Sequence, residues 1–347
     1  MKLLDIKNFV TGKIVGLLGG QKVMALQIDI TNACNLSCAH CYHVHHQNKG
    51  AIGFDDWCNV ILQYKAMIEK LHLSPSIVIC GGEPTISPML LPILQKFDEH
   101  WPGVRISILT NGTRLTDSLL GKLKAFNIEF QISLDGPDAR RHDEVRGAGT
   151  FAKAADAIRR AKAQGFDVFL LAILSKKTSS WIEEFFFMAK DLGANQMNFT
   201  RFISQGAGAE LEMSGVDRAL RPHELKDALT NIWFTSQNFK VRTNTDQALY
   251  NLIDPRLGAS EKYGFQGLVI DYKGNLKVSS RADFIIGNVL AQGLENLFFN
   301  NTVLRNLRRA KIEKCGSCSH YRRCGGSRNA SFAASGSFLK ADPGCWI

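Results

Sequence analysis

Apolar and polar residues follow two different periods along the chain, and the two periods alternate. Six short runs of β-branched and apolar residues predict buried strands, at 25–30, 76–80, 105–110, 128–134, 168–174 and 196–199. The segments between them carry apolar residues at helical spacing and predict helices at 54–71, 88–99, 117–125, 151–164 and 181–192. This regular alternation predicts an α/β fold with a parallel sheet.

Six strand–helix units are too few to close an eight-stranded barrel. The pattern therefore leaves two architectures open, a partial barrel and a doubly wound sheet. Both place a ligand site at the carboxyl ends of the strands, so the residues directly after the predicted strands are the candidates for chemistry.

The pattern changes beyond the sixth predicted strand. The stretch 205–215 is rich in glycine and acidic residues and marks the exit from the α/β region. Further on, 222–238 predicts a helix, 267–280 a hairpin and 293–310 more helix. The predicted organisation is an N-terminal extension at 1–21, a core at 22–215, and a linker with a small C-terminal domain at 216–347.

Composition narrows the class of protein. The 347 residues are 45% hydrophobic, and 42 Lys and Arg against 32 Asp and Glu give a formal charge of +10. Such a surplus suits carboxylate-rich or phosphate-bearing partners, or is only a basic surface. No nucleic-acid partner is expected, because the aromatic-plus-basic pattern of an RNA-binding module is missing. The most apolar N-terminal stretch, 9–19, is short and interrupted by Lys13, so we expect no membrane span and a cytoplasmic location.

Nine cysteines in a chain without an export signal point to metal ligands or catalytic thiols rather than disulfides. Three of them, Cys34, Cys38 and Cys41, follow the first predicted strand within eight residues. A 4Fe-4S cluster held by three cysteines keeps one iron open for a small molecule. A zinc site is the alternative, with His40, His43, His45 or His46 as the fourth ligand. Otherwise we expect those histidines to be solvated loop residues.

A second set of cysteines lies near the C-terminus. The gaps between its members are two, five and twenty residues, and the members are Cys315, Cys318, Cys324 and Cys345. Four cysteines close a metal site by themselves, and both zinc and a 4Fe-4S cluster fit this spacing.

The first cysteine motif, with Tyr42 directly after Cys41, resembles the CxxxCxxC signature of the radical S-adenosylmethionine (SAM) superfamily. The resemblance implies that the open iron chelates the amino and carboxylate groups of SAM. It also implies reductive cleavage of SAM to a 5'-deoxyadenosyl radical that abstracts hydrogen from a substrate, with an electron donor of the flavodoxin or ferredoxin type. It further favours a partial (β/α)6 TIM-like barrel.

The turn after the second predicted strand resembles the GGEP motif of the same superfamily and consists of Gly81, Gly82, Glu83 and Pro84. The resemblance implies that the glycines allow close approach of the backbone and that the carboxylate receives the methionine ammonium group of SAM. Without the resemblance, the same residues would be a tight turn with a stray acid.

Residues after the third and fourth strands continue the resemblance. Asn111, Ser133 and Arg146 are candidates for contacts with the ribose and the methionine carboxylate of SAM. Asp135 suits either a turn-capping or a substrate-side role. Asp135 and Cys80 are the candidates for a catalytic role, Cys80 as a hydrogen-atom donor, although a buried structural thiol is the simpler interpretation of Cys80.

The second cysteine set resembles the end of a SPASM domain, the auxiliary-cluster module of several radical SAM families. A complete SPASM domain holds two clusters, but Gly264, Ser279 and Arg328 stand where further cysteines would fall. The resemblance therefore implies one auxiliary 4Fe-4S cluster, which would be an electron relay or a structural staple. The fold class predicted in full is the partial barrel with a small C-terminal SPASM- or twitch-like Fe-S domain.

Three reactions suit these resemblances. The first is maturation of a ribosomally synthesised peptide, with a separate leader-binding protein as a possible partner. The second is side-chain modification of a tetrapyrrole such as a heme or d-type heme precursor, and the third is oxidation or epimerisation of a sugar or aminocyclitol. A non-enzymatic iron-sulfur or zinc protein would leave the Gly81 to Pro84 turn unexplained.

Overall fold

The computed structural model describes residues 23–43, 46–258 and 267–347. Nine strands of these residues form one sheet in the order β6-β5-β4-β3-β2-β1-β7-β8-β9. Their bounds are β1 Val23–Asp29, β2 Ser74–Cys80, β3 Ile106–Thr110, β4 Ile128–Ser133, β5 Asp167–Leu174, β6 Gln196–Arg201, β7 Gly267–Ile270, β8 Asn275–Lys277 and β9 Ile285–Asn288.

The first six strands lie side by side in chain order, and every neighbouring pair is parallel. A doubly wound sheet would reverse its order at a switch point, and this one does not. The two edge strands are not paired with each other, so the barrel is open. The predicted partial (β/α)6 TIM-like barrel is confirmed, with the ends of its six strands shifted by at most two residues.

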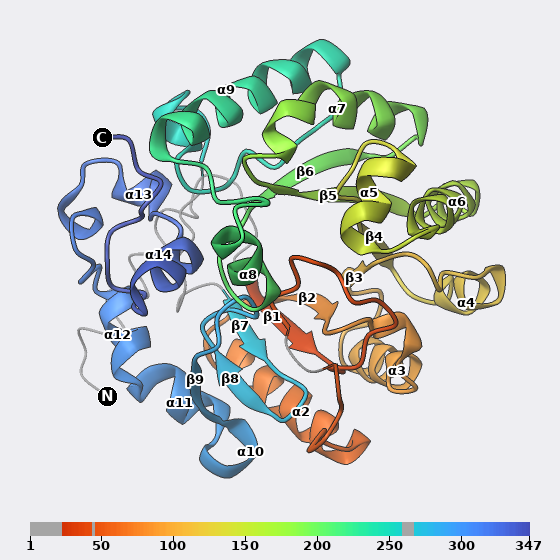
Figure 1. Ribbon diagram of the computed structural model, residues 1–347. Coiled ribbons are helices and arrows are strands. Elements are labelled where there is room, and N and C mark those ends of the chain that lie inside the picture. The colour runs from red at the N-terminus through yellow and green to blue at the C-terminus, as the bar shows by residue number, and fades with distance from the viewer. Residues whose placement is uncertain (1–22, 44–45, 259–266) are drawn as a thin grey trace.

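Helices cover the outer face of the sheet, as Figure 1 shows for α2, α3, α4, α6 and α7. The helix bounds are α2 Phe54–Lys70, α3 Leu90–His100, α4 Asp117–Leu123, α5 Ala139–Arg146, α6 Thr150–Ala163, α7 Ile182–Asp191, α8 Ala207–Met213, α9 Pro222–Phe239, α10 Val289–Gln292, α11 Leu294–Asn300, α12 Thr302–Arg308, α13 Tyr321–Cys324 and α14 Arg328–Ser335. The long helix α2 illustrates the cause: Trp57, Ile61 and Tyr64 recur at helical spacing and are buried. Each such side chain contributes about 1.5–3 kcal/mol by leaving water.

Some helices were missed by apolar periodicity. Helix α5 is strongly polar, and its start is fixed instead by Asp138, whose side chain accepts a hydrogen bond from the Arg141 backbone N–H. The predicted helix at 293–310 is two helices, because Asn301 caps the start of α12 and its extended backbone ends α11. The stretch 205–215 contains α8 rather than only an exit loop.

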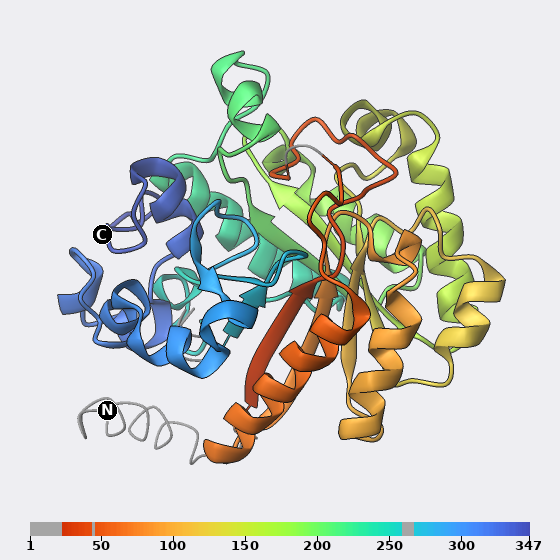
Figure 2. The same ribbon diagram turned by 90° about the horizontal axis from the view of Figure 1, so that it is seen from below.

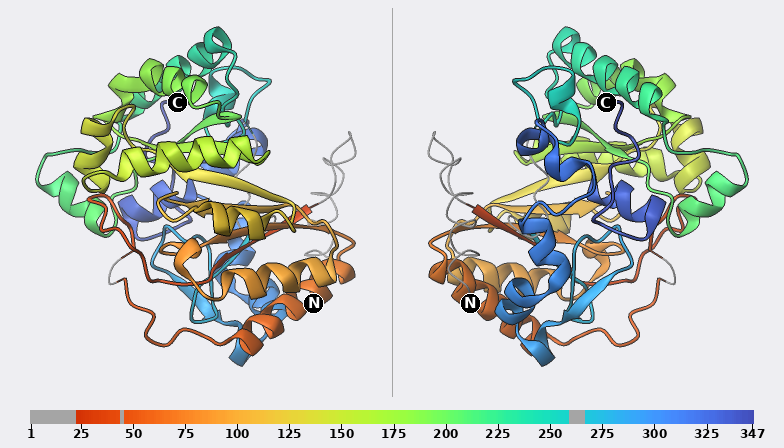
Figure 3. Two further views of the ribbon diagram at one scale, coloured as in Figure 1. Left: turned by 90° about the vertical axis from the view of Figure 1, so that its right-hand side faces the viewer. Right: turned by 90° about the vertical axis from the view of Figure 1, so that its left-hand side faces the viewer.

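The C-terminal segment continues the sheet of the core. Strand β7 pairs in parallel with β1, and β8 and β9 follow as antiparallel strands. Helices α12 to α14 lie on the open side of the sheet, between α9 and the β7–β9 strands (Figures 1 and 2), and in the right-hand panel of Figure 3 this blue segment lies in front of the strands. The domain limits at residues 215 and 216 stay a prediction, and the extension at 1–21 lies outside the described residues.

A largely buried ion pair connects the end of β6 with the C-terminal segment. The Arg201 guanidinium, at the end of β6, donates to both carboxylate oxygens of Asp342 at 2.8 and 2.9 Å. Among the described residues, no helix has the length and apolar content needed to cross a membrane.

Candidate active site

A cavity of about 470 Å³ opens at the carboxyl ends of the strands. Its walls come from all six core strands and from two later segments that contribute Asn244, Gln247, Ser280 and Arg281. Most of the residues predicted for the site line it together: Cys34, Cys38, Cys41, Tyr42, Cys80, Gly81, Gly82, Asn111, Ser133, Asp135 and Arg146. The rule that parallel α/β sheets bind ligands at this edge therefore holds here.

Three cysteines of one loop face this cavity. Burial raises the pKa of Cys34 to about 11 and also raises the pKa values of Cys38 and Cys41, so uncomplexed they would be neutral thiols. An electropositive metal group that binds thiolates would reverse that preference. Among the described residues, no three His, Cys, Asp or Glu side chains are arranged to hold a single metal ion. A 4Fe-4S cluster instead takes each cysteine on a different iron.

The glycine turn after β2 packs against the backbone of the cysteine loop. The Gly82 N–H donates to the Thr31 carbonyl at 2.8 Å, and the Glu83 N–H donates to the Ala33 carbonyl at 2.9 Å. A Cβ on Gly82 would lie 2.3 Å from the Ala33 carbonyl oxygen, and Gly81 has φ +137°. The glycines therefore allow the backbone of the cysteine loop to approach the turn closely.

The Glu83 side chain has a different place from the one expected. Its carboxylate accepts hydrogen bonds from Thr110 Oγ1 at 2.6 Å, from the Asn111 N–H at 2.7 Å and from Thr85. It is 1% exposed, and neither Glu83 nor Pro84 is among the residues that line the cavity. Burial raises the pKa of Glu83, and these donors oppose the rise. The Glu83 carboxylate thus joins the ends of β2 and β3 while the glycine backbone faces the cavity, an arrangement that does not favour the expected ammonium contact, which stays a prediction.

A buried ion cluster also forms part of the cavity wall. Arg146 Nε donates to Asp135 Oδ2 at 2.5 Å, and His40 Nε2 lies 2.8 Å from the same oxygen. The backbone N–H of Ile173 donates to Asp135 Oδ1 at 2.8 Å. Burial alone would raise the pKa of Asp135, but Arg146 and His40 hold it well below its usual range. Asp135 is therefore an anion that orients Arg146, and His40 is not the solvated loop residue that we expected.

Arg146 connects this cluster to the cysteine loop. Its Nη1 lies 3.9 Å from Cys38 Sγ, and its guanidinium lowers the pKa of the Cys38 thiol against the larger opposing effect of burial. A fixed cation beside the thiols favours both a bound thiolate group and a carboxylate ligand.

Comparison with known proteins assigns this site. The sequence profile of the Radical SAM superfamily matches residues 28–189, which include the cysteine loop, the glycine turn and Arg146. Residues 28–189 form a radical SAM domain. This domain indicates a radical SAM enzyme, and the family implies SAM and one 4Fe-4S cluster as its cofactors.

Relatives of this radical SAM enzyme cover nearly the whole chain. Mycofactocin maturase MftC of Mycobacterium tuberculosis is 29% identical over 335 residues, 93% of this chain and 82% of its own length. The AdoMet-dependent heme synthase of Methanosarcina barkeri is 26% identical over 339 residues, 91% of this chain and 94% of its own. The structure of Streptococcus suis SuiB bound to precursor peptide SuiA superposes with a TM-score of 0.72 at 17% identity, over 99% of this chain and 80% of that one. That likeness shows a shared fold.

Further titratable side chains lie in the wall of the radical SAM cavity or near it. Asp29, at the end of β1, is 2% exposed, and burial raises its pKa to about 6. His43 lines the cavity, and burial lowers its pKa to about 4, so it is neutral. Cys80 and Tyr42 also line the cavity, and burial raises the pKa of each well above its usual range. The buried position of Cys80 agrees with a structural thiol; a role as hydrogen-atom donor stays a hypothesis.

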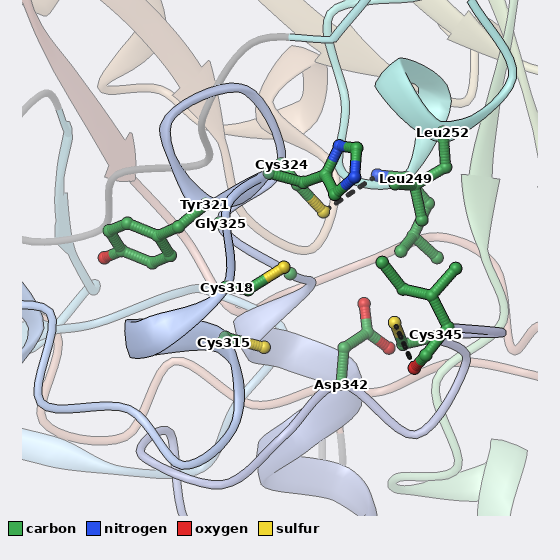
Figure 4. A pocket seen from close by; sticks show the side chains of 12 residues that line it. Leu249, Leu252, Cys315, Cys318, Tyr321, Cys324, Gly325, Asp342 and Cys345 are labelled. Atoms are coloured by element: carbon green, nitrogen blue, oxygen red, sulfur yellow. Dashed lines mark hydrogen bonds between the residues drawn. The ribbon is translucent and has the colours of Figure 1, made fainter.

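The second cysteine set gathers around a much smaller space. Cys315, Cys318, Cys324 and Cys345 line a cavity of about 20 Å³, and Figure 4 shows their sulfur atoms around a common space while Tyr321 points away. The Leu249 N–H donates to Cys324 Sγ at 3.3 Å. Burial raises the pKa of Cys324 to about 11 and also raises that of Cys345.

The structure describes two of the three positions at which a complete SPASM domain would have further cysteines, and both side chains are buried. Ser279 is buried beside the hairpin and Arg328 is buried at the start of α14. Gly264 lies outside the described residues.

Proposed function

We propose that this radical SAM enzyme modifies a ribosomally synthesised peptide. The observation that carries the proposal is the relative named a maturase, because the likeness to it covers 93% of this chain and is not limited to the radical SAM domain. A cavity of about 470 Å³ that opens at the strand ends gives a peptide side chain access to the same space as the three cysteines.

Within the proposal, each residue of the cavity has a role in binding or orientation. Cys34, Cys38 and Cys41 would hold the first cluster. When bound, the cluster and SAM supply reductive homolysis of SAM, which gives methionine and the 5'-deoxyadenosyl radical. Arg146, held in place by Asp135, would orient the methionine carboxylate of SAM through a charge-assisted hydrogen bond.

Asn111 and Ser133 would complete the SAM site. Both line the cavity, and Asn111 Nδ2 donates to the Asn35 side chain at 3.0 Å, which fixes its amide beside the cysteine loop. The backbone of Gly81 and Gly82, rather than the Glu83 carboxylate, would face the methionine ammonium group.

We further propose that Cys315, Cys318, Cys324 and Cys345 hold one auxiliary 4Fe-4S cluster. All four sulfur atoms surround one space (Figure 4), and four ligands leave no open iron. Such a cluster would relay electrons or staple the C-terminal segment. A flavodoxin- or ferredoxin-type protein would supply the electrons, and a separate leader-binding protein would present the peptide.

Modification of a tetrapyrrole is the second candidate, favoured by the heme synthase relative, which matches 94% of its own length. Anaerobic incubation of the reconstituted, reduced enzyme with SAM decides between the two. We expect the mass of a short peptide encoded beside its gene to change, and that of a propionate-bearing iron tetrapyrrole to stay constant. Cys34→Ala is the control for radical chemistry. A mass change of the tetrapyrrole alone would replace the first proposal with the second.

A further inference from the structure

The C-terminal segment places a cation in the wall of the active-site cavity. Arg281 follows β8, lines the cavity and donates through Nη1 to Thr200 Oγ1 on β6. Since β8 and β6 belong to opposite sides of the open barrel, this loop spans the gap between them. Arg281 is therefore held in position by the fold rather than left free in solvent.

The charges of the cavity are otherwise balanced. Asp135 is paired with both Arg146 and His40. Among the described residues, by contrast, no carboxylate forms an ion pair with Arg281, whose hydrogen-bond partner is a neutral hydroxyl. A half-buried guanidinium without an anion is incompletely compensated, and it favours an anionic ligand.

Two further polar side chains of the same cavity are held at Phe199, the residue before the Thr200 partner of Arg281. Gln247 Nε2 donates to the Phe199 carbonyl at 3.0 Å, and the Phe199 N–H donates to Asn244 Oδ1 at 3.2 Å. Both amide side chains are thereby held against β6 at the cavity wall. Convergent polar groups around one cation are the arrangement by which a pocket orients a ligand.

We propose that Arg281 binds a carboxylate of the substrate. A guanidinium presents two parallel N–H donors that match a carboxylate, and Arg146 already serves the cysteine side of the cavity. The proposal rests on the proposed function and narrows it. A peptide would offer its C-terminal or a side-chain carboxylate and a tetrapyrrole a propionate, whereas a neutral sugar would offer none.

The test compares two probes that differ only in charge, 3-phenylpropionate and 3-phenylpropionamide. Their affinities are measured by calorimetry on the anaerobically reconstituted enzyme with SAM bound. We expect the acid to bind at least about tenfold more tightly than the amide, as a charged hydrogen bond allows. Arg281→Met should abolish this preference and Arg281→Lys should retain part of it. Arg242→Met removes an equal charge from an exposed side chain and is the matched control.

Equal or undetectable binding of acid and amide to the wild-type enzyme would overturn the proposal. So would an Arg281→Met variant that keeps the preference, or one that loses SAM affinity while still preferring the acid. The probes bind without radical chemistry. A failure to modify peptide or tetrapyrrole would thus count against the proposed function and leave this result standing.

A separate observation concerns Arg328, which is 1% exposed at the start of α14. Its guanidinium donates to the carbonyls of Gly326, Phe338 and Lys340 at 2.8 to 3.1 Å. Its Nη2 lies 3.6 Å from Cys315 Sγ. Among the described residues, no carboxylate forms an ion pair with it, and the nearby Asp342 is paired with Arg201.

A buried cation without a counter-anion is costly. We infer that its counter-charge is the thiolate-ligated auxiliary cluster, and that Arg328 raises the reduction potential of that cluster. Four thiolates outweigh the charge of the iron-sulfur core, and reduction makes the site more negative, so a fixed cation beside Cys315 stabilises the reduced state. This inference rests on the proposed auxiliary cluster.

A potentiometric titration followed by electron paramagnetic resonance (EPR) tests the inference. Arg328→Met should lower the potential of the auxiliary cluster by at least about 59 mV, a tenfold change in a one-electron equilibrium. Arg328→Lys should lower it less, and the potential of the first cluster should not move. Arg322→Met removes an exposed charge on α13, which solvent screens, and is the control.

Unchanged potentials in Arg328→Met would overturn the inference. If that variant fails to retain iron, Arg328→Lys decides: retained iron supports a counter-charge, and loss of iron in both variants shows that the side chain serves only packing.

Discussion

The two cysteine sets of this chain use the same side chain in opposite surroundings. Cys34, Cys38 and Cys41 lie on a loop at the strand ends and face a cavity of about 470 Å³. The C-terminal four surround only about 20 Å³. The first site has room for a cluster and further ligands, and the second would have room for little beyond the metal group that we propose for it. The volume of the adjoining cavity, rather than the number of cysteines alone, distinguishes the open cysteine site from the closed one.

The two cysteine sets also differ in how the fold holds them in position. The first loop is bonded to the glycine turn of β2, so the parallel sheet fixes its position. The second set rests on short helices and depends on the Arg201–Asp342 pair for its connection to β6. Damage to one site should therefore affect the chain differently from damage to the other.

The largest expected effect concerns the open site. Cys34→Ala should lower the rate of SAM cleavage by at least about a thousandfold, or about 4 kcal/mol in activation free energy, because the cluster loses one of its three ligands. Chromatographic assay of 5'-deoxyadenosine measures the rate. Cys58→Ala is the matched control, since Cys58 lies on α2 and does not line the cavity. Cleavage that persists in Cys34→Ala would refute the assignment.

The second-largest expected effect concerns the Arg201–Asp342 ion pair, which connects the core with the C-terminal segment. Arg201→Met should cost about 3–5 kcal/mol of unfolding free energy, because it leaves the buried carboxylate of Asp342 without its cation. Denaturant unfolding of the anaerobic protein measures the loss. Burial alone would raise the pKa of Asp342, and Arg201 holds it low. The loss should therefore be full above the ordinary Asp pKa and shrink in acid, and a loss independent of pH would contradict this account.

The smallest effect concerns Asp29, whose charged neighbours Lys277 and Asp271 belong to the C-terminal segment. Burial raises its pKa from 3.8 to about 6, so the folded state binds more protons than the unfolded state between these values. Its contribution is therefore present at low pH and is lost as pH rises through about 6. Asp29→Asn should stabilise the protein by about 3 kcal/mol at pH 8 and by nothing below pH 4. Thermal unfolding at both pH values measures this, and equal effects would contradict it.

Much of the core could be predicted from the sequence, because apolar periodicity reports which face of a strand or helix is buried. The six parallel strands followed from it directly, and the cysteine loop followed from the spacing of Cys34, Cys38 and Cys41. Helix α5 did not, since it is polar on all sides and its start depends on a cap. The hydrogen bonds of Glu83 could not be predicted, because the sequence does not show that Thr85, Thr110 and Asn111 converge on its carboxylate.

The remaining features of the site depend on contacts between segments that lie far apart in the sequence. The ion cluster of His40, Asp135 and Arg146 joins residues that are up to 106 positions apart, and no local pattern encodes it. Arg281 likewise reaches the cavity only because the hairpin extends the core sheet beside β1. Such positions require the fold, since the chain alone does not show which loops meet.

The most direct test of an open and a closed cluster is the EPR spectrum of the reduced enzyme with and without SAM. Two signals are expected, and SAM should shift one of them while the other stays constant, because only the cluster of Cys34, Cys38 and Cys41 has an open iron. In Cys318→Ala the constant signal should disappear and about four irons should be lost. Two signals that both respond to SAM, a constant signal that survives in Cys318→Ala, or zinc in place of the second cluster would contradict the account.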